Sequence, residues 1–156
     1  MESLKKVTGT WHGTYAYESP ELSAKRQPVP FTLILKQGWF GRFTGSVTEQ
    51  DPAPGIRGSG VIEGYLAFPR IEFHKRMPVF YVALPDGRNI TMREYLIEQG
   101  HPCERDVPAP PIFYQGEFSS ARRAQGTWII QAQQIPLADG SAIQMPGTKG
   151  VWSIET

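Results

Sequence analysis

The sequence predicts an all-β protein, a single up-and-down antiparallel β-barrel of about eight or nine strands. The tripeptide Gly-Thr-Trp occurs at Gly9–Trp11 and again at Gly126–Trp128, and each copy opens a stretch of alternating large and small or polar side chains. Turns are frequent, since the chain contains 16 glycines and 14 prolines. Similar strands near both ends of such a chain can pair with each other, and that pairing closes a sheet into a barrel.

Nine segments carry the two-residue alternation of a half-buried strand. Phe31, Leu33 and Leu35 share one face of the second segment, and Ile71 and Phe73 share one face of the fifth. Residues that favour turns separate the segments, which indicates hairpin connections. The expected strands span residues 9–17, 31–36, 39–48, 57–66, 70–77, 79–84, 112–118, 126–134 and 148–155.

The strand pattern is interrupted between about residues 89 and 111. Thr91-Met-Arg-Glu94 is a capping box, and Gly100 stands where the helix that it begins would end. A helix of about two turns over Thr91–Gln99 must dock an apolar face. We expect this helix and the proline-rich loop after it to cap one mouth of the barrel. The face that would dock carries Met92, Tyr95, Leu96 and Gln99.

Length and composition exclude several classes of protein. The 156 residues suit one domain, and the net charge of +1 with mixed signs offers no electrostatic footprint for nucleic acid or an anionic membrane. No run approaches the ~20 apolar residues of a membrane span. The single cysteine, Cys103, allows no internal disulfide, so we expect a cytoplasmic protein. His12, His74 and His101 lack the spacing of metal ligands, and no metal is expected.

The strand pattern resembles the calycin superfamily, which comprises lipocalins, fatty-acid-binding proteins and avidins. The residues that carry the resemblance are Gly9–Trp11 in the first strand and Gly126–Trp128 or Gly150–Trp152 near the end. The chain lacks the Thr-Asp-Tyr turn and late arginine of lipocalins and the paired N-terminal helices of fatty-acid-binding proteins. It is also similar to an uncharacterised bacterial lipocalin-like group. The resemblance implies a barrel with an internal cavity but no particular ligand.

Glu63 and His74 are the candidate acid–base residues. Glu63 shares a strand face with Tyr65, and burial inside the barrel would raise the pKa of its carboxyl towards neutrality. On the outer face it would be ordinary surface. His74 alternates with Glu72 and Arg76, so these three side chains point the same way. The opposite face of that strand is apolar, which favours an outer position for His74 and its neighbours.

Aromatic residues are the candidate ligand-binding set. They fall on strand faces that can line one cavity, and glycines on the facing strands are expected to leave room for a ligand. The aromatic residues are Trp11, Tyr15, Tyr17, Phe31, Phe43, Tyr114 and Trp128. The glycines are Gly13, Gly45, Gly58, Gly60 and Gly64.

Three functions remain open on this basis. The favoured hypothesis is binding of a small hydrophobic or aromatic molecule inside the barrel. The alternative is a cofactor-independent enzyme, an acid–base isomerase, cyclase or hydrolase that uses the same cavity. The third is a filled barrel that acts as an interaction module, and a homodimer also stays open. The number of ionisable groups that face the inside of the barrel distinguishes these hypotheses. One such group indicates a polar anchor for a bound ligand, and two or more within hydrogen-bond reach favour catalysis.

Overall fold

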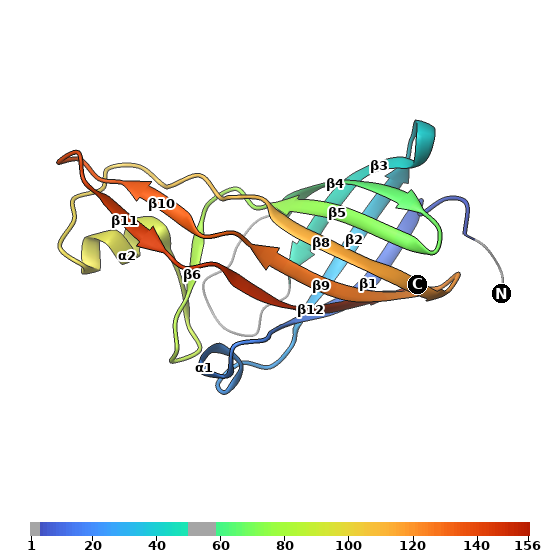
Figure 1. Cartoon of the computed structure of the whole chain (residues 1–156), viewed down its shortest axis with the longest axis horizontal. Helices are drawn as coiled ribbons and strands as arrows, with labels where there is room; N and C mark the ends of the chain where they lie inside the picture. The colour runs from blue at the N-terminus through green and yellow to red at the C-terminus, as the bar shows by residue number, and fades with distance from the viewer. Residues whose placement is uncertain (1–3, 50–58) are drawn as a thin grey trace.

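The computed structural model describes residues 4–49 and 59–156, which form a β-barrel with a smaller lobe extending from one end (Figure 1). Among these residues eight strands form the closed barrel. Each strand pairs with the next barrel strand along the chain, which confirms the predicted up-and-down topology. The barrel strands are β1 (Gly9–Tyr17), β2 (Val29–Gln37), β3 (Arg42–Glu49), β4 (Ser59–Ala67), β5 (Arg70–Arg76), β8 (Ile112–Ser120), β9 (Arg123–Ile130) and β12 (Thr148–Glu155).

Antiparallel pairing of β1 with β12 closes the barrel, as the similar first and last segments predict. In the neighbouring β9–β12 pair, Trp128 lies opposite Gly150, and Trp152 lies opposite Gly126. A Cβ atom on Gly150 would lie 2.5 Å from the Trp128 ring, and one on Gly116 would lie 2.8 Å from the Trp152 ring. Glycines therefore let both indoles lie across the inner wall, and this explains the Gly-x-Trp pattern at Gly126–Trp128 and Gly150–Trp152.

Side chains fill most of the barrel interior. Trp11 closes the end at which β1 begins, where it meets Phe118 with ring centroids 5.7 Å apart and donates its Nε1–H to the Val7 carbonyl at 2.8 Å. Nearer the middle, the rings of Phe73 and Tyr114 stack with centroids 4.7 Å apart. Burial of these rings supplies the hydrophobic stabilisation that holds the barrel together. We call the end of the barrel at which β1 begins the tip end, and the opposite end the lobe end.

The glycines expected to leave room for a ligand instead make room for rings. A Cβ atom on Gly64 would lie 2.5 Å from Cζ of Phe43, and one on Gly13 would lie 2.9 Å from Cζ of Phe31. Beside Gly45 and Gly60 the nearest side chains are those of Leu35, Val47 and Met77. The expectation of a cavity beside the described glycines is therefore wrong, because neighbouring side chains and backbone occupy the space. Gly58 lies outside the described residues.

Two insertions between barrel strands form the lobe, at the end of Figure 1 away from the N-terminus. The lobe has its own small core, made by Phe80, Met92, Leu96 and Ile135. The segment expected as a strand over 79–84 lies here and not in the barrel. One insertion consists of β6 (Tyr81–Ala83), β7 (Asn89–Thr91) and α2 (Met92–Glu98), and the other is the hairpin of β10 (Gln133–Pro136) and β11 (Ala142–Met145).

The predicted capping box begins α2: the Thr91 hydroxyl accepts the Glu94 N–H at 3.1 Å, and the Glu94 carboxylate accepts from Thr91. Met92 and Leu96 are buried as expected, whereas Gln99 is exposed. The helix itself does not cover the barrel mouth, because it packs into the lobe core. The cover comes from chain segments on either side of it, described below.

Two short helical turns lie where the sequence predicts other structure. Residues 39–48 were expected to be one strand, but β3 begins at Arg42, and a 3-10 turn, η1 (Trp39–Gly41), precedes it. A four-residue helix, α1 (Pro20–Ser23), lies in the polar segment after β1. No helix in the described part of the chain is long and apolar enough to cross a membrane.

Candidate functional site

A cavity of about 70 Å³ lies at the lobe end of the barrel. Its barrel wall includes Tyr15, Tyr17, Tyr114 and Trp128, which come from β1, β8 and β9. The segment that leads into β6 and the end of the proline-rich loop cover it from the lobe side. These covering residues are Met77, Val79, Phe80, Tyr81, Ala109 and Pro110. The mouth of the barrel therefore has a cap, and α2 is not part of it.

A buried ion pair lies inside this cavity. Lys75 of β5 is only 3 % exposed, and its ammonium contacts the Glu49 carboxylate of β3, whose side chain is equally buried. The hydroxyl of Tyr15 donates to the second carboxylate oxygen of Glu49 at 3.1 Å. Two cross-strand contacts thus satisfy the carboxylate, as a buried charge requires.

Aromatic rings surround the ammonium. Lys75 Nζ lies 4.7 Å from the ring centroid of Tyr15 and 5.4 Å from that of Tyr114. Rings at this distance attract a cation through their negative faces, and the attraction grows where water is excluded. The site therefore holds a positive charge within a largely apolar enclosure.

The surroundings of the site shift three pKa values in the same direction. Burial alone would lower the pKa of Lys75, but Tyr114 and Glu49 outweigh it, and the pKa is raised. Burial raises the pKa of Tyr17 to about 12, although Arg26 opposes the shift, and burial also raises the pKa of Tyr114. All three groups therefore hold their protons at neutral pH and offer hydrogen-bond donors.

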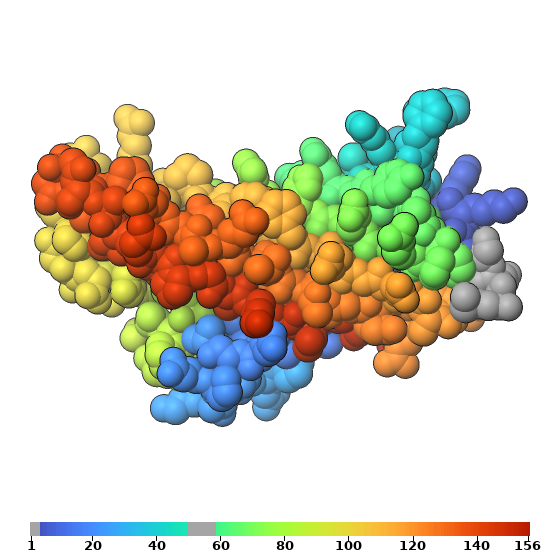
Figure 2. Space-filling view, in the orientation of Figure 1, coloured from blue at the N-terminus to red at the C-terminus, as the bar shows by residue number. Residues whose placement is uncertain are grey.

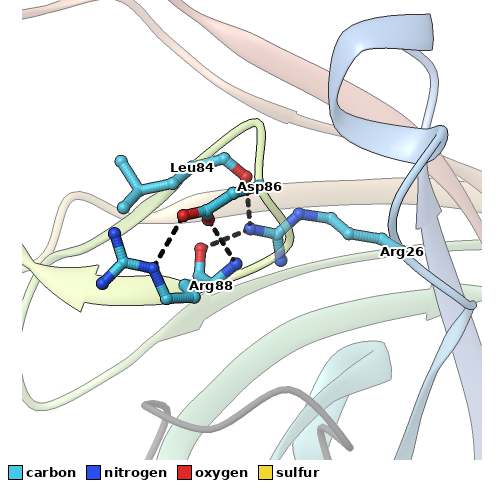
Figure 3. A network of polar contacts seen from close by, with 4 residues as sticks. All are labelled: Arg26, Leu84, Asp86 and Arg88. Carbon is cyan, nitrogen blue, oxygen red and sulfur yellow. Dashed lines mark hydrogen bonds and ion pairs between the residues drawn. The ribbon is translucent and has the colours of Figure 1, made fainter.

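Arg26 links the β6–β7 turn of the lobe to Tyr17 of the barrel. Its guanidinium donates to Asn89 Oδ1 at 2.9 Å, to the Leu84 carbonyl at 3.1 Å and to the Arg88 carbonyl at 2.6 Å. Figure 3 shows this arginine reaching from the segment after β1 into the β6–β7 turn. It also lies over the Tyr17 ring, 5.3 Å from its centroid. One side chain thus links the β6–β7 turn to a wall of the cavity.

An open groove of about 590 Å³ adjoins the cavity on its outer side. It runs between α1, β6 and the β10–β11 hairpin. Four residues line both spaces: Tyr17, Phe80, Tyr81 and Ile130. This set, which we call the shared wall, borders both the inner cavity and the groove.

The structure divides the predicted aromatic set. Tyr15, Tyr17, Tyr114 and Trp128 line the cavity. The other three are core residues that pack against side chains elsewhere in the barrel, and they do not line it. These are Trp11, Phe31 and Phe43.

The two predicted acid–base residues lie outside the cavity. Glu63 and His74 face each other across β4 and β5 on the outer wall, with Oε2 and Nε2 3.4 Å apart. Their side chains are 62 % and 39 % exposed. The inward position considered for Glu63 is therefore wrong, because Ile62 and Leu66 occupy the inner face of β4. The outer position favoured for His74 is confirmed.

Sequence reasoning missed the two charged residues that do face inward. Lys75 continues the inner face of Ile71 and Phe73, and Glu49 continues that of Val47. The two-residue alternation along each strand therefore places both charged side chains on the inner face. The sequence did not reveal the pair for two reasons. A charged residue near the end of a strand usually lies close to solvent, and Glu49 lies two strands away from Lys75. Only the closed barrel brings the two charges together.

No cluster of three or more metal-binding side chains occurs in the described part of the chain. Comparison with family models, with curated proteins and with solved structures found no match to this chain.

Proposed function

We propose that the protein is a calycin-like carrier that binds a small aromatic molecule bearing a hydrogen-bond-accepting oxygen, at the lobe end of its barrel. The buried ammonium of Lys75 within aromatic walls supports this proposal most strongly. A ligand site in a protein is mostly apolar, with a few polar groups that fix the orientation of the ligand. Here Lys75 supplies the polar anchor, and the ligand oxygen takes one of its three N–H donors.

The aromatic walls suit a flat ligand. Trp128 meets Tyr15 with ring centroids 6.0 Å apart and Tyr17 with centroids 5.2 Å apart, at interplanar angles of 84° and 86°. Rings held edge to face present both a π surface and a polarised edge to a further ring. Trp128 is itself fixed by a 3.2 Å hydrogen bond to the Ala16 carbonyl. The Trp128 ring is thus ordered before a ligand arrives.

The size of the site determines how a ligand enters. The cavity of about 70 Å³ is roughly half the ~150 Å³ of an apolar cavity that accepts benzene. A ligand must therefore displace the shared wall and join the cavity to the outer groove. In that arrangement its oxygen reaches Lys75, and its apolar body lies between Tyr17 and Phe80.

Catalysis is the second candidate, because two ionisable groups face inward within hydrogen-bond reach. An acid–base catalyst works best when its pKa lies near the working pH. The raised pKa values of Lys75, Tyr17 and Tyr114 keep all three protonated at neutral pH, which suits donors to a bound ligand better than proton shuttles. In the enzymatic alternative Glu49 would be the base, and Lys75 would stabilise an oxyanion.

The test uses two related fluorescent probes, anionic anilinonaphthalene sulfonate and neutral N-phenylnaphthylamine. We expect both to bind the parent protein. The variant Lys75→Met/Glu49→Gln removes both buried charges together, so that neither is left unpaired. It should bind the sulfonate about tenfold to a hundredfold more weakly, since a hydrogen bond to a charged group contributes ~1.5–3 kcal/mol. Binding of the neutral probe should hardly change.

The exposed pair on the outer wall provides the matched control. Glu63→Gln/His74→Gln also removes a facing pair, and it should bind both probes as the parent does. The proposal is wrong if neither probe binds the parent protein, or if the cavity variant and this control bind the sulfonate equally well.

A further inference from the structure

The connection between β2 and β3, at the tip end, holds two large aromatic side chains out in solvent. Trp39 is 85 % exposed and Phe40 is 89 % exposed. Figures 1 and 2 show this segment projecting beyond the barrel strands. Trp39 and Phe40 are the two most exposed large apolar residues in the described chain, and they are neighbours, so they form one apolar patch of the kind that marks an interaction site.

The turn is built so that the two rings stay exposed. Phe40 adopts a φ of 55°, a left-handed conformation that bulky residues rarely take. The Gly38 N–H donates to the Arg42 carbonyl at 2.6 Å, and the Arg42 N–H donates back to the Trp39 carbonyl, so the turn is closed by two backbone bonds. The two hydrogen bonds fix the backbone of the turn, and the turn therefore holds both rings in defined positions.

Basic side chains flank the rings. Lys36 on β2 and Arg42 on β3 border the turn, and both are exposed. Lys5 and Lys6 lie near them, because the two residues that follow are joined to Gln37 by hydrogen bonds of 3.2 and 2.9 Å. Four positive charges thus lie around one aromatic pair.

The rest of the tip end carries charges of both signs. Arg70, Arg122 and Arg123 lie in or beside the other hairpin turns at this end. The acidic residues near the basic ones, among those described, are Glu63, Glu72, Glu117 and Glu155. The chain has a net charge of only +1, so its mixed sequence hides this asymmetry. The fold gathers seven basic residues against four acidic ones at one end, a larger positive excess than that of the whole chain.

We propose that the tip end docks on the surface of an anionic lipid bilayer, with Trp39 and Phe40 inserted at the interface. Tryptophan favours this depth because its ring is apolar and its N–H is polar. Basic side chains near the surface are attracted by anionic headgroups. Docking in this orientation leaves the groove and the cavity at the lobe end open to solvent.

The fluorescence of Trp39 can report docking directly, because Trp11, Trp128 and Trp152 are each no more than 3 % exposed. An aqueous quencher such as iodide therefore reports Trp39 selectively. We expect mixed phosphatidylcholine–phosphatidylserine vesicles to shift the emission to the blue and protect it from iodide, and added salt to reverse both effects. Pure phosphatidylcholine vesicles should bind far less protein in cosedimentation.

Variants separate the two contributions to docking. Trp39→Ser/Phe40→Asn, in which asparagine tolerates the left-handed backbone, should abolish cosedimentation with the mixed vesicles. Lys5→Gln/Lys6→Gln should weaken it by about fivefold for each charge removed. Phe113→Ser removes a half-exposed ring from the outer barrel wall and should leave it unchanged.

Three results would overturn the proposal. They are no binding of the parent protein to mixed vesicles at low salt, equal binding to pure phosphatidylcholine vesicles, and undiminished binding of the Trp39→Ser/Phe40→Asn variant. A partner protein or a nucleic acid at this end would give the first of these results.

Discussion

At the residue scale, the feature that matters most is a lysine that stays charged inside a barrel. Lys75 keeps its proton because Glu49 and Tyr114 contact it directly, and Tyr15 holds Glu49 in place. A buried pair of this kind often stabilises a fold no better than apolar residues would. The aromatic rings around Lys75 and the adjoining cavity suggest that the pair serves recognition.

The raised pKa of Tyr17 predicts how stability varies at high pH. Below about pH 10 the phenol is protonated in both states, so its contribution is constant. Between about pH 10 and pH 12 the unfolded chain loses this proton while the folded protein, with a pKa of about 12, keeps it. The folded state then binds more protons than the unfolded one, and the free energy of unfolding falls as pH rises.

Urea unfolding at a series of pH values tests this expectation. Tyr17→Phe should flatten the fall above pH 10, by about 2 kcal/mol at pH 12 relative to the parent. Tyr65→Phe, at an exposed position on the outer wall, controls for the loss of a phenol. Equal slopes for the parent and Tyr17→Phe would show that the Tyr17 hydroxyl is not shielded from water.

At the element scale, the lobe and the barrel have separate hydrophobic cores. Met92 and Leu96 of α2 contribute to the lobe core, and Trp128 and Trp152 contribute to that of the barrel. A helix of seven residues is not stable alone, so α2 depends on the β10–β11 hairpin beside it. The lobe should therefore open as a unit while the barrel stays closed.

Amide hydrogen exchange of Leu96→Ala tests this independence. Removing a buried leucine side chain destabilises its surroundings by about 2–5 kcal/mol. Exchange should accelerate in α2, β10 and β11, while the amides of β1 and β12 keep their protection. The neighbouring Ile97→Ala is the matched control, because Ile97 is 51 % exposed and its loss should change little. Faster exchange throughout the barrel would mean that the two cores are one.

At the scale of the whole molecule, the sequence predicts the barrel well. Strand alternation and the repeated Gly-Thr-Trp depend on local rules, and closure by the first and last strands followed from them. The capping box at Thr91 also depends on neighbouring residues alone. These elements were predictable because short-range patterns determine them.

The site was less predictable, because its members meet only in three dimensions. Lys75 and Glu49 lie on strands separated by β4, and no local pattern pairs them. The interior glycines looked like empty space, since sequence alone does not show which ring will fill it. The distribution of charge was unpredictable for the same reason. Basic residues that are scattered along the sequence meet at the tip end because neighbouring strands run in opposite directions.

The proposed function places a ligand beside Lys75 at the lobe end of the barrel. Nuclear Overhauser contacts between bound N-phenylnaphthylamine and the assigned protein protons test it most directly. We expect contacts with the Trp128 ring, the Tyr15 ring and the Met77 methyl, which line the cavity. Contacts confined to Trp39, or to Phe113 on the outer wall, would contradict it, because the probe would then lie on the surface.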